Sequence, residues 1–230
     1  QTMFQENPYC TFTEAFSIIK SNSRVFIHGS ACTPVSLLNE LEKESHRFEN
    51  IEMVSITLKG EIEIFKPQYS RNFHMNSLFV SASIRTAVAE GRADFVPVFL
   101  SDIPYLFSSK ILELDTAIVQ VSPPDQHGYC SLGLSVDIAR SAVDHATQTI
   151  AVINPQIPRT HGDGMIHIKR FAKMVYHDSP LPEESYSSKI GEAEIQIGKH
   201  IADIIEDGST LQMGIGSIPN AVLQCLYNHK

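Results

Sequence analysis

Two glycines near the end of the chain could place backbone amides against a ligand. Gly214 and Gly216 follow the apolar run 210–213 and precede a segment, 217–226, with the spacing of a helix. Glycine has no Cβ, so both residues can turn the backbone sharply and let a ligand approach closely. Free amides at the start of the helix, where Pro219 has no N–H to satisfy, favour a phosphate or a developing oxyanion. A plain tight turn explains the same residues, and the spacing alone does not decide between the two.

Two loops that follow expected strands have the composition of functional loops. Residues 122–133 hold two prolines, an acid, a histidine and several small residues, and residues 154–164 bring Arg159, His161 and Asp163 together. Loops on a rigid sheet often carry binding or catalytic residues. The alternatives are a turn that prolines make rigid and a cluster of surface charges, and the residues leave both open.

Strands and helices alternate along most of the chain, which predicts how these loops are placed. An apolar strand at 24–28 leads through a turn into a helix at 34–45, and the same order recurs as far as residue 153. Alternation of this kind, with strands apolar on both faces, predicts an α/β fold in which helices cover a mostly parallel sheet. Ligands bind such sheets at the carboxyl ends of the strands, where loops lead into helices. Further strands are expected at 51–58, 94–99, 116–121 and 149–153, and further helices at 11–21, 84–90 and 135–146.

A polar, proline-containing stretch at 177–184 predicts a boundary between two domains. We assign residues 1–180 to a first α/β domain and residues 181–230 to the beginning of a second. The second segment holds a long helix at 183–206, a strand at 210–213 and the glycine turn. One strand cannot close a sheet, so we expect the second domain to be incomplete.

The composition excludes several classes of partner and site. A net charge of −8 without a basic stripe argues against a nucleic-acid partner. The chain has no run of eighteen apolar residues and no leader pattern, so we expect no membrane span and a cytoplasmic protein, or a mitochondrial one in a eukaryote. Neither the cysteines nor the ten histidines have ligand spacing, which predicts free thiols and no metal site. The cysteines are Cys10, Cys32, Cys130 and Cys225.

Five stretches carry a resemblance to a known family, and they stand in the family's order. They are residues 76–80 (NSLFV), 85–104 (RTAVAEGRADFVPVFLSDIP), 119–133 (VQVSPPDQHGYCSLG), 154–164 (NPQIPRTHGDG) and 214–222 (GIGSIPNAV). From about residue 13 onward the sequence resembles the acetyl-CoA hydrolase/transferase family, and it is most similar to the 4-hydroxybutyrate or butyrate CoA-transferases. Members of the family resemble two packed α/β halves, and this chain is similar to the N-terminal part.

The resemblance implies a coenzyme A loop and a nucleophile that this chain lacks. In the family a glutamate downstream of the loop takes the acyl group and then forms a glutamyl-CoA thioester, which splits one difficult transfer into easier covalent steps. We expect that glutamate beyond Lys230, because Glu192, Glu194 and Glu206 precede the glycine turn. We therefore expect the 230-residue chain alone to be inactive. The residues that match the coenzyme A loop are Gly214, Ile215, Gly216, Ser217 and Ile218.

Two other sets of residues, both in the first domain, are candidates for the substrate site. Both follow strands, at the end of the sheet where α/β proteins bind ligands. The strand-to-helix turn offers Gly29, Ser30 and Thr33 as the lining of an acyl or carboxylate pocket. The residues of a second loop, which we expect to face the cleft, are Gln120, Ser122 and His127.

The reaction that the resemblance implies is transfer of coenzyme A between acetyl- or butyryl-CoA and a short carboxylic acid such as 4-hydroxybutyrate. Acyl-CoA is then a substrate, no permanently bound cofactor is expected, and assembly into a homo-oligomer is left open. Three alternatives remain: a hydrolase of the same family, in which water attacks the thioester; a truncated module without activity; and a nicotinamide-dependent dehydrogenase. The sequence lacks the third glycine and the ribose-binding acid that the last of these needs.

Overall fold

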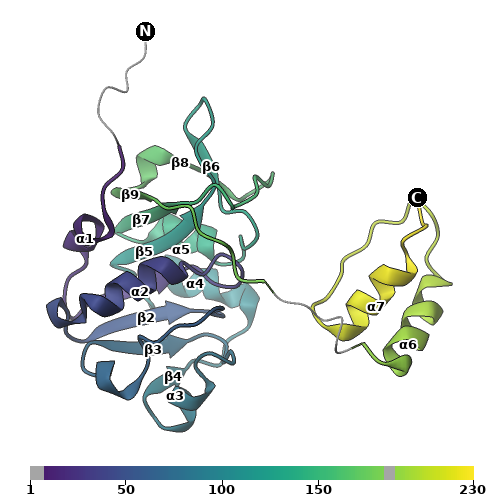
Figure 1. The fold of residues 1–230 in the computed structure, drawn as a ribbon, viewed down its shortest axis with the longest axis horizontal. Coiled ribbons are helices and arrows are strands. Elements are labelled where there is room, and N and C mark those ends of the chain that lie inside the picture. The colour runs from purple at the N-terminus through teal and green to yellow at the C-terminus, as the bar shows by residue number, and fades with distance from the viewer. Residues whose placement is uncertain (1–7, 184–189) are drawn as a thin grey trace. The chain divides into compact units, whose positions relative to one another are not determined.

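A computed structural model describes residues 8–183 and 190–230 of the chain. The chain divides into two compact units, Gln1–Pro182 and Glu183–Lys230 (Figure 1). The division falls in the proline-containing stretch that marks a domain boundary in the sequence. Compactness is not independent folding, so the assignment of two domains stays a prediction.

Within the described residues, seven parallel strands form the sheet of the first unit, in the order β4-β3-β2-β1-β5-β7-β9 (Figure 1). The chain starts at the centre of the sheet, builds outward from β1 to β4, and then returns to place β5 on the other side of β1. This arrangement confirms the predicted α/β fold with a mostly parallel sheet. The strands are β1 Arg24–Ile27, β2 Ile51–Ser55, β3 Phe73–Ser77, β4 Ala93–Phe95, β5 Thr116–Val121, β7 Gln148–Ile153 and β9 Lys173–Tyr176; a small antiparallel sheet pairs β6 Tyr129–Ser131 with β8 Met165–His167.

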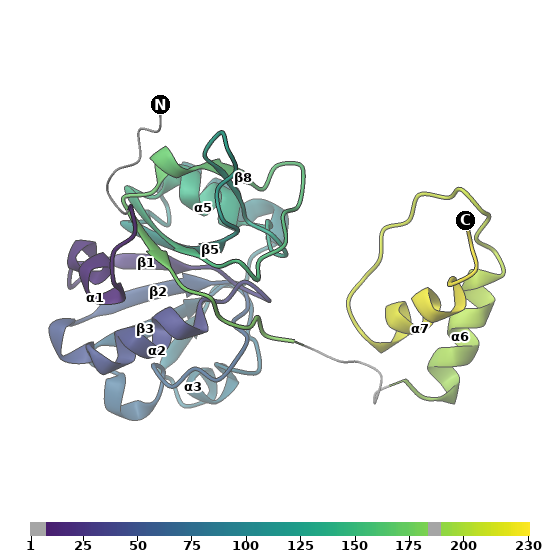
Figure 2. The same ribbon diagram turned by 45° about the horizontal axis from the view of Figure 1, so that its top comes forward.

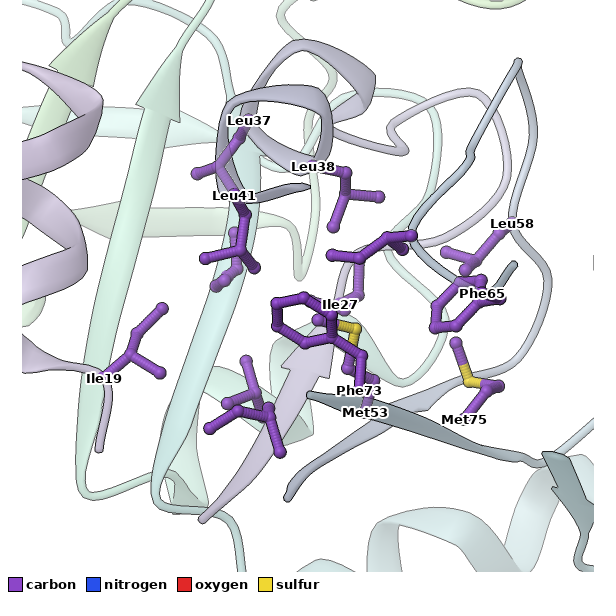
Figure 3. Packing of buried hydrophobic residues seen from close by; sticks show 14 of the residues in the cluster. Ile19, Ile27, Leu37, Leu38, Leu41, Met53, Leu58, Phe65, Phe73 and Met75 are labelled. Atoms are coloured by element: carbon purple, nitrogen blue, oxygen red, sulfur yellow. The ribbon is translucent and has the colours of Figure 1, made fainter. Parts of the chain in front are cut away.

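Buried apolar side chains form two clusters, one on each face of the sheet. Val25 and Ile27 of β1 belong to the first cluster, and Phe26 between them belongs to the second, because successive residues of a strand point to opposite faces. Figure 3 shows the first cluster, in which the leucines of α2 lie over the strands. The helices of this unit are α1 Phe12–Ala15, α2 Val35–Lys43, α3 Arg85–Ala89, α4 Ile103–Ser108 and α5 Ala139–His145.

The predicted elements of the first unit are present, mostly with shorter bounds. The helix predicted at 11–21 is the single turn of α1 followed by a 3₁₀ turn at Phe16–Ile18. The strand predicted at 94–99 ends at Phe95, since Pro97 has no N–H to donate to a ladder. The strand predicted at 116–121 is β5, with the same bounds.

The second unit consists, in its described part, of two helices that pack against each other (Figure 2). They are α6 Glu192–Ala202 and α7 Ser217–Cys225. Gly198 lies at their contact, where a Cβ would lie 2.9 Å from the carbonyl carbon and oxygen of Ala221. Glycine therefore lets the two helices approach closely.

The strand predicted at 210–213 is not formed, so that prediction is wrong. A strand needs a neighbour to pair its N–H and C=O groups, and no strand is present among the described residues of the second unit. The helix predicted at 183–206 is α6 in its described part, and residues 184–189 lie outside the described residues. Gly208 lies beyond the end of α6 and has a φ of +80°.

None of the helices in residues 8–183 and 190–230 has the length and apolar character that crossing a membrane requires. In the same ranges, no group of three acidic, histidine or cysteine side chains could hold a metal ion. All four cysteines are free thiols. Burial raises the pKa of the Cys130 thiol to about 12, so this group stays protonated near neutral pH.

Candidate functional site

The turn after β1 lies at the carboxyl end of the sheet, beside the point where the strand order reverses between β1 and β5. A Cβ on Gly29 would lie 2.6 Å from the carbonyl oxygen of Thr57, so only glycine lets this turn lie so close to the loop after β2. Ser30 has a φ of +54° and donates its N–H to the same carbonyl at 2.7 Å. The hydroxyls of Ser30 and Thr57 are 2.8 Å apart, so the two loops are held together by backbone and side chain.

Thr33 closes this turn from inside. Its side chain is buried, and its hydroxyl donates to the carbonyl of Ser30 at 2.8 Å and accepts the N–H of Lys59 at 3.1 Å. The structure thus brings Gly29, Ser30 and Thr33 into one turn, and the hydrogen bonds of both hydroxyls stay within the fold. Their role as the lining of a pocket stays a prediction.

His28 anchors the start of the turn and is fully buried. The N–H of Gln120 donates to Nδ1 of His28 at 3.1 Å, so Nδ1 carries no proton and Nε2 donates to the carbonyl of Ser135 at 2.6 Å. Burial lowers the pKa of His28 below its ordinary value of 6.5. Both ring nitrogens are therefore occupied in a neutral imidazole, and His28 holds structure rather than moving protons.

The three residues that we expected on one loop facing the cleft lie in different environments. Gln120 and Ser122 are buried, and only His127 is exposed. Ser122 joins β5 to β6, since its hydroxyl accepts the N–H of Ser131 at 2.8 Å. Their residue types predicted exposure because polar side chains usually face water, but here the polar groups of two of them are satisfied inside the fold.

Asp125 and Arg159 form an ion pair between the two polar loops, with 2.6 Å between Arg159 Nη2 and Asp125 Oδ2. The N–H groups of Tyr129 and His127 donate to the same carboxylate, and together with the Arg159 charge they lower the pKa of Asp125. Asp163 instead lies 3.7 Å from Arg140. Arg159 therefore pairs with an acid of the other loop and not with Asp163 as predicted, and this ion pair joins the two polar loops.

The glycine turn of the second unit is open. Gly216 is the N-cap of α7 and has a φ of +135°, a conformation that residues with a side chain rarely adopt. A Cβ on Gly214 would meet only the ring of Pro219, at 3.4 Å. Ile215 is 90% exposed, and Ile218 is also exposed. The turn thus presents backbone at the start of a helix, which suits a ligand that needs amide donors and close approach.

Two hollows in the first unit lie apart from the turn after β1. One of about 250 Å³ is at the amino ends of β1, β2 and β5, where Arg24 pairs with Glu52 at 2.8 Å. Another of about 460 Å³ is lined mainly by apolar residues around Phe99. Ligands of α/β sheets bind at the carboxyl ends of strands, so the first hollow is on the side opposite to the expected site.

Comparison with known proteins decides the family. The model of the acetyl-CoA hydrolase/transferase N-terminal domain matches residues 3–207. The chain belongs to the acetyl-CoA hydrolase/transferase family. The match spans most of the chain, runs past the division between the two units, and ends before the glycine turn.

Relatives within this family are CoA-transferases by name. The chain is 43% identical over 220 residues to a succinyl-CoA:acetate/propanoyl-CoA:succinate CoA transferase of Fasciola hepatica, covering 94% of this chain and 45% of the relative. It is 42% identical over 220 residues to the 4-hydroxybutyrate coenzyme A transferase of Clostridium kluyveri, covering 96% and 51%. A crystal structure of 4-hydroxybutyrate CoA-transferase from Porphyromonas gingivalis has a TM-score of 0.75 at 29% identity, covering 97% and 52%. The chain thus spans about half the length of the relatives that it matches, and the predicted family resemblance is confirmed.

Several polar residues that hold the turn after β1, directly or through Gln120, were not among the site residues predicted from the sequence. Thr57 and Lys59 hold the turn from the loop after β2, and Asn154 lies buried beyond β7. A polar residue directly after an apolar strand was the available signal for Asn154. For Thr57 and Lys59 the sequence carries no such signal, because the pairing depends on which strands are neighbours.

Proposed function

We propose that this protein works as a CoA-transferase, moving coenzyme A between an acyl-CoA such as acetyl- or butyryl-CoA and a short carboxylic acid. The observation that carries the proposal is the 42–43% identity, over 94–96% of this chain, to two enzymes named as CoA-transferases. The names of both relatives include short carboxylates, namely acetate, succinate and 4-hydroxybutyrate. The acid used by this protein is therefore of the same class.

The glycine turn of the second unit is the proposed coenzyme A loop. Beside Gly214 there is space that only the ring of Pro219 borders. Gly216 adopts a φ of +135° and places a backbone without a side chain at the start of α7. An amide at this place can donate to the oxygen of a thioester as negative charge develops on it. The loop consists of Gly214, Ile215, Gly216, Ser217 and Ile218.

The turn after β1 is the proposed site for the acyl or carboxylate group. It lies beside the reversal of strand order between β1 and β5, which is where open α/β sheets bind ligands. Gly29 keeps the turn against the loop after β2, and the hydroxyls of Ser30 and Thr33 fix its shape. This turn would position the substrate, and the glycine turn would hold the thioester.

The proposed chemistry uses a glutamate that the described residues do not supply. Its carboxylate oxygen attacks the thioester carbonyl, the thiolate of coenzyme A leaves, and a mixed anhydride forms. The thiolate then attacks the glutamyl carbonyl, which releases the free acid and leaves a glutamyl-CoA thioester. The same steps in reverse order load the second acid. We propose that this glutamate belongs to the half that the relatives have and this chain does not span.

Label exchange tests this function directly. The protein encoded by the native gene is incubated with butyryl-CoA and labelled acetate, and labelled acetyl-CoA is measured, together with coenzyme A release when acetate is omitted. We expect labelled acetyl-CoA to form, with little release without acetate. Release that does not depend on acetate would identify a hydrolase instead. Residues 1–230 alone are expected to give no exchange, and exchange by that fragment would refute the assignment of the nucleophile.

A further inference from the structure

Two buried amide side chains lie side by side at the carboxyl ends of neighbouring strands. Gln120 is the fifth residue of β5, and Asn154 directly follows β7. Both are almost inaccessible, with 3% and 0% of their surface exposed. A buried amide side chain costs stability unless its N–H and C=O groups are hydrogen-bonded. The hydrogen-bond partners of these two residues therefore show which segments they join.

Gln120 reaches the turn after β1. Its Nε2 donates to the carbonyls of Cys32 and Thr33, at 3.3 and 3.4 Å, and its Oε1 accepts from Nδ2 of Asn154 at 2.9 Å. Carbonyls only accept, so these partners fix which end of the amide faces the turn. The two carbonyls belong to the last residues before Pro34 and α2, where the turn becomes helix.

Asn154 continues the chain of hydrogen bonds to a distant segment. Its Nδ2 also donates to the carbonyl of Ser179 at 2.9 Å, and its Oδ1 accepts the N–H groups of Gln156 and Ser179 at 3.0 and 3.4 Å. Ser179 lies beyond β9, between the sheet and the end of the first unit at Pro182. The turn after β1 and the last segment of the first unit are therefore tied through two side chains.

We propose that Gln120 is a positioning residue that sets the shape of the acyl and carboxylate pocket at the turn after β1, with Asn154 holding it in place; this inference rests on the proposed function. Gln120 fixes the two carbonyls that follow Ser30, so removing its amide frees the turn to shift. Small shifts at a binding turn change which substrates fit, because each added methylene must find space.

The test compares two acceptors in the protein that the native gene encodes. We measure kcat/KM for acetate and for butyrate in the wild type and in Gln120→Met, and follow the ratio of the two values. The fraction of active enzyme cancels in this ratio, so general loss of folded protein leaves it unchanged. We expect the ratio to change by about fivefold or more, the effect of losing one net hydrogen bond.

A matched control removes the same amide from the opposite end of the sheet. Gln148, at the start of β7, donates to the carbonyl of Ile18 at 2.7 Å and to the hydroxyl of Thr116 at 3.2 Å. Gln148→Met should leave the acetate-to-butyrate ratio unchanged. An unchanged ratio in Gln120→Met, or an equal change in Gln148→Met, overturns the proposal.

Two further measurements test the proposal if Gln120→Met does not fold or if the wild type transfers no coenzyme A. If Gln120→Met does not fold, Gln120→Glu keeps the size of the side chain; its protonated carboxyl can donate to one carbonyl, so the ratio should approach the wild-type value as the pH falls. If the wild type transfers no coenzyme A, the proposed function fails, and hydrogen exchange still tests the positioning. The amides of Cys32 and Thr33 should then exchange faster in Gln120→Met than in Gln148→Met, and equal rates would contradict it.

Discussion

The two glycine turns of this chain obtain their shape in different ways. The turn after β1 is held by the loop after β2, by a buried histidine and by a buried glutamine. In the turn before α7, a Cβ added at Gly214 or Gly216 would meet only the ring of Pro219, and the Ile215 side chain is almost fully exposed. The first turn is therefore fixed by the fold itself, whereas the second offers open backbone. This difference suits one turn that positions a small acid and another that receives a large thioester.

The difference extends to the units that carry the turns. The first unit packs two apolar clusters against a seven-stranded sheet. Within the described residues of the second unit, the buried apolar side chains are Ala202, Ala221 and Val222. Since burial of apolar surface supplies most of the stability of a fold, changes in the first turn should be felt in stability and changes in the second in function.

The largest expected effect on stability comes from Gly29→Ala. The new Cβ would lie 2.6 Å from the carbonyl oxygen of Thr57, which is backbone and cannot rotate away. We expect the free energy of unfolding of the first unit to fall by about 2 to 3 kcal/mol, as overpacking does in a close-packed region. Urea unfolding of the purified chain measures it. An unchanged midpoint would show that the two loops separate easily. The turn after β1 would then not be fixed by its packing against the loop after β2.

A smaller effect concerns pH, through His28. Burial lowers its pKa in the folded protein, so below the ordinary value of 6.5 the unfolded chain binds a proton that the folded chain does not. The stability contribution is therefore complete above pH 6.5 and is lost as the pH falls toward the folded pKa, by at most about 1.4 kcal/mol per pH unit. Urea midpoints at several pH values should show a shallower slope in His28→Gln than in the wild type. Parallel slopes would mean that His28 binds its proton equally well in the folded and the unfolded chain, so that its pKa is not lowered.

The smallest effect is expected from Gly214→Ala. A Cβ there meets only the ring of Pro219 at 3.4 Å, an ordinary contact. The free energy of unfolding should stay within about 0.5 kcal/mol of the wild-type value, as for surface substitutions. Gly29→Ala is the matched change in the other turn. A loss of stability as large as that of Gly29→Ala would show that the second turn is also fixed by packing.

Much of the fold could be predicted because its signals are local. All six residues of β5 are buried, and the mainly apolar sequence at 116–121 predicted its bounds correctly. No strand was predicted at β3, because its polar residues His74 and Asn76 interrupt the apolar run by which the other strands were found. The strand at 210–213 was predicted from apolar composition, but a strand also needs a partner, which composition cannot show.

In the candidate site, too, the features with local sequence signals could be predicted and those that depend on strand pairing could not. The glycine turn before α7 could be found from sequence because its residues are contiguous and its glycines have a local conformational purpose. The hydrogen bonds that Gln120 makes to the turn after β1 could not be found from sequence. Gln120 lies 87 and 88 positions along the chain from the carbonyls that it binds, and 34 positions from Asn154. These residues come together in space only when β1, β5 and β7 lie side by side in the sheet. Sequence therefore predicted where the turn lies and missed what fixes it.

Gly214 is a better test of the coenzyme A loop than Gly216. Gly216 has a φ of +135°, so any side chain there strains the backbone, and a loss of activity would have two explanations. Gly214 has no positive φ and has room beside it. Gly214→Val therefore places bulk where the thioester is expected and leaves the backbone conformation accessible. Ser209→Val, at an exposed loop position of the same unit outside residues 214–218, controls for general damage to a loop.

The most direct measurement of the central claim is the rate of coenzyme A transfer from butyryl-CoA to acetate by Gly214→Val, taken with its thermal midpoint, in the protein that the native gene encodes. We predict that transfer falls about a hundredfold, because the added bulk displaces the thioester from an oriented donor worth about 3 kcal/mol, while the midpoint moves by only a few degrees. Ser209→Val should keep a larger share of the wild-type rate. Near-normal transfer by a normally folded Gly214→Val would contradict the account and leave the glycine turn as a structural feature without a ligand.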